Sequence, residues 1–405
     1  MSFVKENNRT IPKEDKVFAV SGRAKAAIAA KGKDAVVDAT IGALLDDKGD
    51  LVVMTSVMEA IGMLKPADYA AYAPIAGVPE FKEAVQKALF ADYKPARHIA
   101  VCATPGGTGS LTHAVANYTN RGDEILTHDW CWANYKGIAD EHGRSVKTFR
   151  FFDEEGKFDS ADLKSKLDEL AAKQEQVLLM INTPAHNPTG YSLTDEDWDN
   201  VINIVNAASC KVVLFVDIAY IDFAGEPDEV RAFIPKLEGL GTHVLTLFGY
   251  SASKTLTAYG MRCGATVCLA KTAEEAEEFT KAVGYTSRST WSNCNRSAQV
   301  VMGKIYSDDA LCAKVDEERK LYRDMLLERG KAFEQTLREN GVKSVPFTAG
   351  FFITIPSDKP DEICKKLEEQ DIFCLALAKG IRVSIASISK DNCLKCAKAI
   401  AELLK

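Results

Sequence analysis

A lysine closes an apolar run in the segment GYSASKTLTAYGMRCG, which spans residues 249–264. Lys254 follows small hydroxyl-bearing residues, and Arg262 comes eight residues later. An ammonium group at the edge of a water-poor site loses its proton more easily, so such a lysine can act as a nucleophile and as a base. A solvated loop lysine would also fit this segment, so a role for Lys254 needs support from other residues.

An aspartate stands in a second apolar run, VVLFVDIAY, with a tyrosine three residues after it. A carboxylate such as that of Asp217 is costly in apolar surroundings unless it meets a cation or hydrogen-bond donors. We expect either a cationic ligand group for Asp217 or, as the simpler alternative, neighbouring backbone N–H groups.

A glycine-rich turn follows a third run: VCATP leads into GGTGS, residues 106–110, and then into a helical pattern. Backbone N–H groups at the start of a helix bind phosphate together with the helix dipole. The turn does not fit G-x-G-x-x-G, which counts against a dinucleotide site. An ordinary glycine turn at a helix start remains the alternative.

Taken together, these residues suit one ligand. It would be anionic at one end, to meet the glycine turn, Ser251 and Arg262. It would carry a basic nitrogen that Asp217 keeps protonated, and a carbonyl that Lys254 captures. Pyridoxal 5'-phosphate has all three features, and a lysine with an acidic partner for the ring nitrogen is its usual protein setting. The sequence therefore predicts pyridoxal phosphate as the cofactor.

The elements that must position these residues alternate between short apolar runs and longer amphipathic ones. Near-continuous Val, Ile and Leu runs separated by helical patterns indicate strands covered on both faces of a mainly parallel sheet. Such a doubly wound sheet binds its ligand at the carboxyl ends of the strands. The expected strands lie at residues 98–105, 124–130, 176–184, 211–220, 243–251 and 263–270.

The pattern changes after residue 300, where a long helical period over 310–340 precedes short strands and a last helix. We predict an α/β protein with a large doubly wound cofactor-binding domain over 49–299. The segments 1–48 and 300–405 are predicted to form a smaller α+β domain.

Composition limits the class of protein. The 405 residues carry a formal net charge of −7, with no basic cluster typical of a nucleic-acid site and no apolar run of about 20 residues to span a membrane. The N-terminal segment MSFVKENNRTIPKEDK lacks an apolar signal core. Eleven scattered cysteines fit reduced thiols, and the Cys393–Cys396 pair reads as two helix residues rather than a zinc site. We expect a cytoplasmic protein that binds neither nucleic acid nor membrane.

Several motifs in one order make the chain resemble the class I pyridoxal-phosphate aminotransferases, closest to the aspartate and aromatic branch. They are AHNPTG at residues 185–190, the Asp217 to Tyr220 spacing, and S-x-x-K with an arginine eight residues later. TIGALLDDKGDLVVMTSV and YAPIAGVPEFKEAV also look like the family's N-terminal segments, so the similarity covers most of residues 40–390. The resemblance implies that family's fold, known as fold type I.

The resemblance also implies roles for residues at the cofactor. Lys254 would bond to the cofactor aldehyde and then move the proton at the substrate α-carbon, with Asp217 at the ring nitrogen and Tyr220 as the third catalytic residue. Tyr220 and Asn187 would bind the phenolic oxygen, and Trp132 would stack on the ring. The phosphate would meet Gly107, Thr108, Ser251 and Arg262, together with Tyr72 from a second subunit, so a homodimer with shared active sites is implied.

Two arginines are expected to recognise the substrate. Arg382, in GIRVSIA, matches the family's clamp for the substrate α-carboxylate. Gly42 would let the backbone approach the same region, beside Trp132 and Asn187. Arg288, in YTSRSTWSN, matches the partner-subunit arginine that reads a side-chain carboxylate, although a surface arginine on a loop would look the same.

The chain departs from the family pattern at three places. Tyr135 stands where the aspartate branch usually has a histidine behind the ring-binding aspartate. Gly106 replaces a common serine at the phosphate turn, and SNCNR replaces a usual proline pair after Arg288. These changes leave the chemistry intact and put the choice of substrate in question.

The sequence thus predicts a homodimeric transaminase with a ping-pong mechanism. Amino transfer between a dicarboxylic amino acid, aspartate foremost, and 2-oxoglutarate is the leading interpretation, and an aromatic aminotransferase is the nearest alternative. A β-lyase, or a non-enzymatic regulator that binds the cofactor, is the more distant one.

Overall fold

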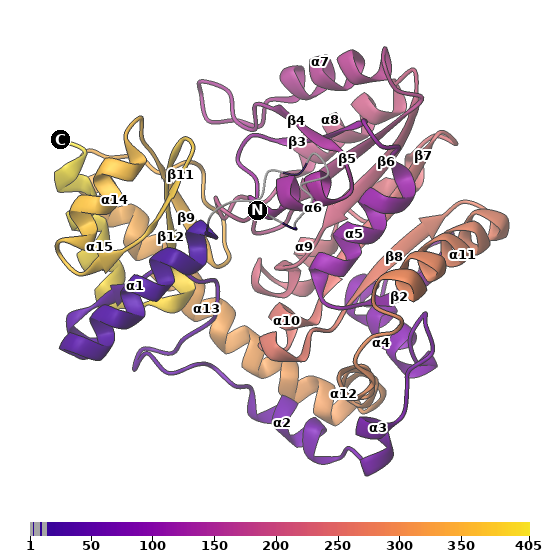
Figure 1. The fold of residues 1–405 in the computed structure, drawn as a ribbon, viewed down its shortest axis with the longest axis horizontal. Helices are drawn as coiled ribbons and strands as arrows, with labels where there is room; N and C mark the ends of the chain where they lie inside the picture. The colour runs from indigo at the N-terminus through magenta and orange to yellow at the C-terminus, as the bar shows by residue number, and fades with distance from the viewer. Residues whose placement is uncertain (1–2, 4–8, 10–13) are drawn as a thin grey trace. The chain divides into compact units, whose positions relative to one another are not determined.

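The computed structural model describes residues 3, 9 and 14–405, so most of the segment MSFVKENNRTIPKEDK lies outside the described residues. The chain forms two compact units, which we treat separately (Figure 1). The first unit contains Val53–Thr183 and Leu193–Arg319, and the second contains 14–52, Pro184–Ser192 and Lys320–Lys405. The division into a large domain over 49–299 and a small domain over 1–48 and 300–405 stays a prediction.

A seven-stranded sheet in the order β2-β8-β7-β6-β5-β3-β4 forms the centre of the first unit (Figure 1). β8 runs antiparallel to both of its neighbours, and the other neighbouring strands pair in parallel. The strands are β2 (His98–Thr104), β3 (Glu124–His128), β4 (Ser145–Phe149), β5 (Gln176–Asn182), β6 (Lys211–Asp217), β7 (Val244–Ser251) and β8 (Gly264–Ala270).

Helices cover both faces of this sheet, which explains why its central strands are apolar throughout. Leu178 and Met180 of β5 pack with Leu111 and Phe279, which belong to helices on one face. Because successive side chains of a strand point to opposite faces, Leu179 faces the other way, and it is fully buried as well. Burial of each such side chain stabilises the fold by about 1.5–3 kcal/mol.

The helices of the first unit follow the expected alternation with strands. Those packed near the sheet are α4 (Pro79–Phe90), α5 (Gly107–Tyr118), α6 (Asn134–Glu141), α7 (Ser160–Ala171), α8 (Asp195–Asn206) and α11 (Ala273–Thr290). The remaining ones are α2 (Thr55–Gly62), α3 (Pro66–Ala70), η2 (Ile221–Phe223), α9 (Pro227–Arg231), η3 (Pro235–Gly239), α10 (Ala252–Thr255), η4 (Tyr259–Met261) and α12 (Arg296–Ser307). The boundary between the units falls inside α13 (Asp309–Glu339).

The second unit has a three-stranded antiparallel sheet in the order β11-β12-β9 and a parallel pair of β1 with β10. Its strands are β1 (Val37–Asp38), β9 (Phe352–Pro356), β10 (Ile372–Phe373), β11 (Leu375–Leu377) and β12 (Gly380–Ser384). Its helices are η1 (Lys33–Ala35), α1 (Lys16–Lys31), α14 (Pro360–Glu368), η5 (Ile385–Ser387) and α15 (Lys390–Leu403).

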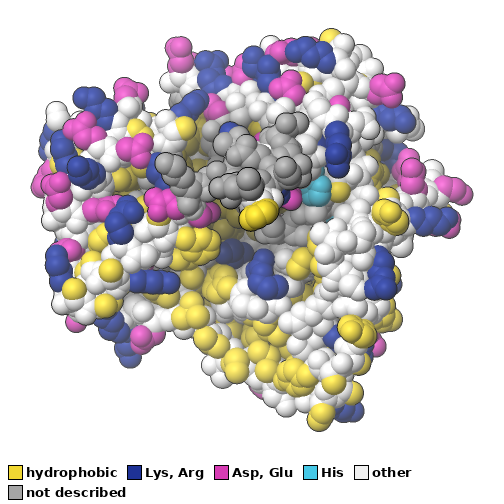
Figure 2. Space-filling model, in the orientation of Figure 1, with side chains coloured by type: hydrophobic (Ala, Val, Ile, Leu, Met, Phe, Trp, Pro, Cys, Tyr) yellow, Lys and Arg dark blue, Asp and Glu magenta, His cyan; other side chains and the backbone are white. Residues whose placement is uncertain are grey.

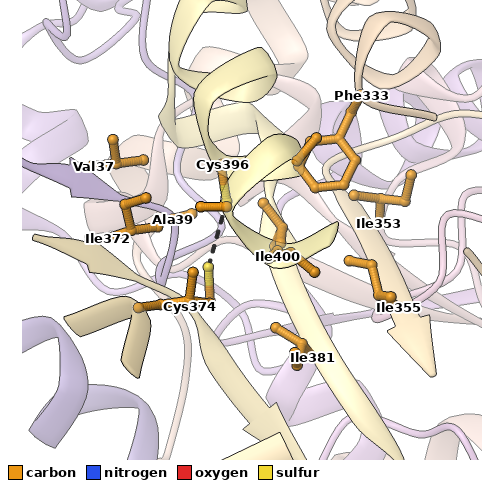
Figure 3. Close-up of a cluster of buried hydrophobic side chains, with 14 of the residues drawn as sticks. Val37, Ala39, Phe333, Ile353, Ile355, Ile372, Cys374, Ile381, Cys396 and Ile400 are labelled. Carbon is orange, nitrogen blue, oxygen red and sulfur yellow. Dashed lines mark hydrogen bonds between the residues drawn. The ribbon is translucent and has the colours of Figure 1, made fainter. Parts of the chain in front are cut away.

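Figure 3 shows the apolar core of this second unit. Phe333 of α13 and Ile400 of α15 lie among isoleucines of the strands, and all are almost fully buried. Cys374 and Cys396 meet in this core with their sulfur atoms 3.7 Å apart, and all eleven cysteines of the chain are free thiols. Cys393 and Cys396 are both buried on α15. In the described part of the chain, no group of three His, Cys, Asp or Glu residues could hold a metal ion.

The structure confirms the predicted fold class, a large mostly parallel sheet with a smaller α+β part. Among the residues that the structure describes, no helix is long and apolar enough to cross a membrane.

Candidate active site

The register of the large sheet places the polar strand ends of the first unit at one edge. Asp217, the last residue of β6, pairs with Gly249 of β7, and Ser251 at the end of β7 pairs with Gly264. Gly264 also pairs with Thr104, where β2 ends and the glycine turn begins. The turn, the hydroxyl of Ser251 and the Asp217 carboxylate therefore share the carboxyl edge, where α/β sheets bind ligands.

The glycine turn is shaped to hold an anion. Gly106 has a φ of +75°, a conformation that L side chains rarely adopt, and α5 begins at the next residue. Gly107 lies next to Ser251, because an added Cβ would come 3.4 Å from the serine Cβ. The N–H groups at the start of α5, including that of Thr108, and the Ser251 hydroxyl make the kind of donor set that a phosphate requires.

Arg262 brings a full positive charge to the same turn. A Cβ built on Gly106 would lie 2.4 Å from its Nη2, so only glycine admits the guanidinium this close. Nη1 donates to Ser253 Oγ at 2.9 Å, and Nη2 reaches the Pro105 carbonyl at 3.4 Å. Arg262 itself is exposed, so its guanidinium is open to a ligand. Ser253 is not among the site residues predicted from the sequence, although this serine lies inside the S-x-x-K motif.

Asp217 is held in place by two donors. The Tyr135 hydroxyl donates to Oδ2 at 2.7 Å, and the Ala219 N–H donates to Oδ1 at 3.2 Å. Burial raises the pKa of the Asp217 carboxyl to about 6, even though these hydrogen bonds lower it. Burial and the neighbouring Asp217 raise the pKa of Tyr135 well above its usual value, so Tyr135 stays a donor. A cationic ring nitrogen at Asp217 would relieve the cost of this buried carboxylate.

Lys254 lies on α10, the single helical turn that follows β7. Its Nζ is 4.7 Å from the centre of the Tyr259 ring and 5.5 Å from that of Tyr220, within the range of a cation–π contact. The structure thus places Lys254 and Tyr220 near each other, and their roles at a cofactor stay a prediction. Tyr259 is an additional neighbour that the sequence analysis missed, since an aromatic residue five positions after a lysine carries no signal by itself.

Three other predicted residues of the first unit, Trp132, Tyr72 and Arg288, are exposed or half-buried. Trp132 is half-buried, and its ring lies edge-on to Tyr135 at 6.1 Å. Tyr72 is 88% exposed, and Arg288 is exposed at the end of α11, where its Nη1 donates to Ser292 Oγ. That Tyr72 and Arg288 serve the active site of a second subunit stays a prediction.

A second group of predicted residues gathers in the second unit around Arg382 of β12. Arg382 is buried, and its Nη2 donates to the Thr40 carbonyl at 2.6 Å while its Nη1 donates to Asn187 Oδ1 at 3.3 Å. Its guanidinium carbon lies 4.5 Å from the centre of the Phe352 ring. An added Cβ on Gly42 would come 2.4 Å from Phe352, so Gly42 gives this ring its room. Phe352 is a supporting residue that the sequence analysis did not name.

The first unit combines an anion-binding turn, a lysine and a buried aspartate, a set of residues that suits a phosphorylated carbonyl cofactor. Comparison with known proteins agrees with this class. The model of the family of class I and II aminotransferases matches residues 34–400. The aromatic-amino-acid aminotransferase of Paracoccus denitrificans is 26% identical over 402 residues, which cover 96% of this chain and 97% of that protein. The aspartate aminotransferase of Salmonella typhi is 26% identical over 374 residues, covering 90% and 92%.

A crystal structure of an aminotransferase from Anaerococcus prevotii matches with a TM-score of 0.96 and 35% identity, and the match covers 100% of this chain and 99% of that one. The chain belongs to the class I and II aminotransferase family. It is a transaminase that depends on pyridoxal phosphate, as the sequence predicts. The residues fit this cofactor, because Gly106 leaves room for Arg262 at the anion turn and Asp217 offers a carboxylate to the ring nitrogen.

Proposed function

We propose that the protein transfers the amino group between aspartate and 2-oxoglutarate in a ping-pong reaction. The observation that carries this proposal is the pair of arginines, Arg382 in the second unit and Arg288 at the end of α11. Both curated relatives described above support an enzyme of the aspartate and aromatic class. A dicarboxylic substrate needs two cationic partners, and these two arginines are the candidates.

Arg382 is proposed to bind the α-carboxylate that every amino acid substrate carries. Three contacts fix its guanidinium: the Thr40 carbonyl, the Asn187 amide oxygen and the face of Phe352. A planar guanidinium held on one face and along two edges keeps its orientation. The arginine side chain therefore loses less conformational freedom when a carboxylate binds. Gly42 supports this arrangement through the space that it leaves for Phe352.

Arg288 is proposed to read the side-chain carboxylate in the active site of a partner subunit. It is exposed, and its Nη1 donates to Ser292 Oγ, four residues further along the chain. An arginine on the last turn of a helix complements the helix dipole and projects away from it.

The cofactor would be held by the residues that the resemblance assigns. The phosphate would meet Arg262, Ser251 and the N–H groups of Gly107 and Thr108, joined by the partner's Tyr72. Asp217 would pair with the ring nitrogen, and Tyr220 and Asn187 would bind the phenolic oxygen. Trp132 would cover the ring and border the substrate.

The bound cofactor supplies an electron sink next to the substrate α-carbon. Lys254 Nζ, proposed to bond to the cofactor until a substrate displaces it, would then take and return the proton at that carbon. Tyr220 would keep its hydroxyl near the lysine, and the Asp217 carboxylate would hold a proton on the ring nitrogen. Asp217, in turn, is kept in place by Tyr135 and the Ala219 N–H.

A homodimer is part of the proposal, because Arg288 and Tyr72 would act across subunits. Large apolar side chains lie exposed around α2 and α3, and Figure 2 shows yellow side chains gathered where Figure 1 draws these helices. They are Met58, Met63, Tyr69, Tyr72 and Ile75. An apolar surface of this kind favours burial against another protein surface.

The first experiment is an absorbance titration of the purified holoenzyme with single amino acids and no keto acid. If the proposal holds, aspartate and glutamate convert the cofactor to its amine form at far lower concentrations than phenylalanine or tyrosine. An Arg288→Ala variant should lose on the order of a hundredfold in kcat/KM for aspartate. Arg121→Ala, another exposed arginine of the first unit, is the matched control. Normal aspartate turnover by Arg288→Ala would refute the dicarboxylate proposal.

Aromatic amino acid transamination is the second candidate, favoured by the similarity to the Paracoccus denitrificans enzyme. It predicts conversion by phenylalanine and tyrosine even in Arg288→Ala, since that arginine would have no carboxylate to bind.

Mixing two inactive variants tests the shared active site. In a heterodimer of Lys254→Ala and Arg288→Ala subunits, one site has both its own Lys254 and the partner's Arg288. Random reassortment of equal amounts should therefore restore about a quarter of the aspartate activity of the unaltered protein. No recovery in a mixture that has exchanged subunits would place Arg288 and Lys254 in the same subunit's site.

A cytoplasmic location completes the proposal. The eleven free thiols suit a reducing compartment, where disulfides are rare. Fractionation of the source cells should place the protein with cytoplasmic markers.

A further inference from the structure

A buried set of charged residues contacts the turn that carries Lys254. The transaminase chemistry described above does not use these residues. Asp222, Arg231 and Arg319 belong to the first unit, and their side chains are only 6–8% exposed. Asp222 Oδ1 pairs with Arg231 Nη2 at 2.6 Å. Arg319 also donates to the Tyr306 hydroxyl and to Asp316. Such charges are costly to bury, so their arrangement needs an explanation.

Thr255, the residue directly after Lys254, is bonded to this set through its hydroxyl and its carbonyl. Its hydroxyl donates to Asp222 Oδ2 at 2.7 Å, and its carbonyl accepts from Arg319 Nε at 3.0 Å. Thr255 is 2% exposed, so water does not compete for either bond. Burial alone would raise the pKa of the Asp222 carboxyl, but Arg319 and Arg231 hold it below its usual value, so Asp222 is a charged acceptor.

Asp222 also belongs to the segment that carries Tyr220. It lies in η2, two residues after Tyr220, and Arg231 ties that segment to the rest of the unit through the carbonyls of Ala88 and Pro227. The bond between Thr255 and Asp222 therefore joins the lysine-bearing turn to the tyrosine-bearing turn.

The lysine-bearing turn needs such support. α10 is a single four-residue turn, too short to be stable from its own hydrogen bonds, and Thr257 just beyond it has a φ of +48°. The Lys254 side chain adds several rotatable bonds of its own. A shift of the backbone at residue 254 would also displace Nζ.

We propose that the Thr255 hydroxyl, fixed by the Asp222 carboxylate, is a positioning group that sets Lys254 Nζ for its bond with the cofactor aldehyde. This inference rests on the proposed role of Lys254. In that step Nζ attacks the aldehyde carbon, a carbon–nitrogen double bond forms, and the carbonyl oxygen leaves as water. Thr255 and Asp222 are 33 positions apart in the sequence, and neither residue belongs to the glycine turn.

The test follows the covalent step without any amino acid substrate. Full-length protein stripped of cofactor is mixed with pyridoxal phosphate at several concentrations, and the bond is trapped by borohydride at timed points. Mass spectrometry of peptides then gives the fraction of Lys254 that is labelled. In Thr255→Val, which keeps the shape and removes the hydroxyl, the limiting rate should fall about tenfold. The concentration that gives half of the limiting rate should stay the same, because the phosphate turn is intact.

Two further variants separate positioning from general stability. Thr255→Ser restores the hydroxyl and should restore the rate. Thr336→Val removes another buried threonine hydroxyl, which donates to the Ala332 carbonyl in the second unit, and should leave the rate unchanged.

Each outcome has a distinct meaning. Equal limiting rates in Thr255→Val and the unaltered protein would overturn the positioning inference and leave the role of Lys254 standing. A loss of rate that Thr255→Ser fails to restore would also overturn it. If the unaltered protein carries no label on Lys254, both the proposed role of Lys254 and the positioning inference are wrong.

Discussion

The hydroxyl of Tyr135 donates a hydrogen bond of 2.7 Å to Oδ2 of Asp217, at the carboxyl end of β6. Tyr135 is the residue that stands where the aspartate branch usually has a histidine. A histidine can exchange its proton near neutral pH, whereas the pKa of Tyr135 lies well above its usual value because of burial and the adjacent carboxylate. Asp217 therefore has a permanent donor behind it.

Removal of that donor should move the acid limb of the activity profile. The hydrogen bond from Tyr135 lowers the pKa of Asp217, which burial raises to about 6. In Tyr135→Phe the pKa should rise further, so Asp217 becomes protonated at a higher pH and loses its charge. We expect the acid limb of the kcat/KM profile to shift upward by about one pH unit, and kcat/KM at pH 7 to fall about twofold. Tyr118→Phe is the matched control, and an unmoved acid limb in Tyr135→Phe would contradict this account.

A methyl group at Gly106 should weaken cofactor retention. The new Cβ would lie 2.4 Å from Arg262 Nη2, so the guanidinium must leave the turn. The substitution also strains a backbone with φ of +75°, at a cost of about 1–2 kcal/mol. Gly122→Ala separates the two effects, because Gly122 has a φ of +91° and no atom within 4 Å of the added group.

We expect both variants to lose similar thermal stability, and Gly106→Ala alone to bind pyridoxal phosphate roughly ten- to a hundredfold more weakly. Equilibrium dialysis of the cofactor measures this difference. Equal affinities in the two variants would mean that Arg262 does not hold the phosphate.

The sequence predicts most of the large sheet, and the reason is visible in its central strands. β5 and β6 are buried on both faces, so their residues are apolar without interruption and mark the strands clearly. β4 was not among the predicted strands. It is one of the two edge strands, SVKTF, paired with β3, and its partly exposed side chains need not be apolar.

The site residues likewise fall into those that the sequence predicts and those that it does not. Lys254, Asp217 and Arg262 could be picked out because each is a polar residue that follows or interrupts an apolar run. Contacts that join distant parts of the chain left no such signal. The Asp222–Thr255 bond and the stacking of Phe352 on Arg382 depend on how strands and turns pack, and one sequence does not encode that as a local pattern.

Substitution of Arg382 should affect all substrates alike. Lysine keeps the charge in Arg382→Lys but cannot bond both the Thr40 carbonyl and the Asn187 amide while it presents two donors to a carboxylate. We expect kcat/KM to fall about a hundredfold for aspartate and for phenylalanine, mostly through KM. Steady-state kinetics with both amino acids measures this. A loss confined to dicarboxylic substrates would instead assign Arg382 to the side-chain carboxylate.

His113 should make the stability of the protein depend on pH. It is fully buried on α5, with Nδ1 2.9 Å from Thr266 Oγ1 and Nε2 2.9 Å from Ser287 Oγ. Burial lowers the pKa of His113 to about 3, so the folded protein keeps this ring neutral. Once unfolded, the ring takes up a proton below a pH of about 6.5. The unfolded state therefore binds one more proton than the folded state between these two values, and stability must fall as the pH drops through this window.

We expect His113 to contribute a slope of about 1.4 kcal/mol per pH unit between roughly pH 6 and pH 4. Urea unfolding of the unaltered protein and of His113→Gln across this range gives the slope by difference. The contributions of His128 and Asp217, whose pKa values are also shifted, cancel in that comparison. His98→Gln, at an exposed histidine of β2, should keep the slope of the unaltered protein. If His113→Gln kept it too, the imidazole would have to accept its proton inside the folded protein, with both ring nitrogens then donating, to Thr266 and to Ser287.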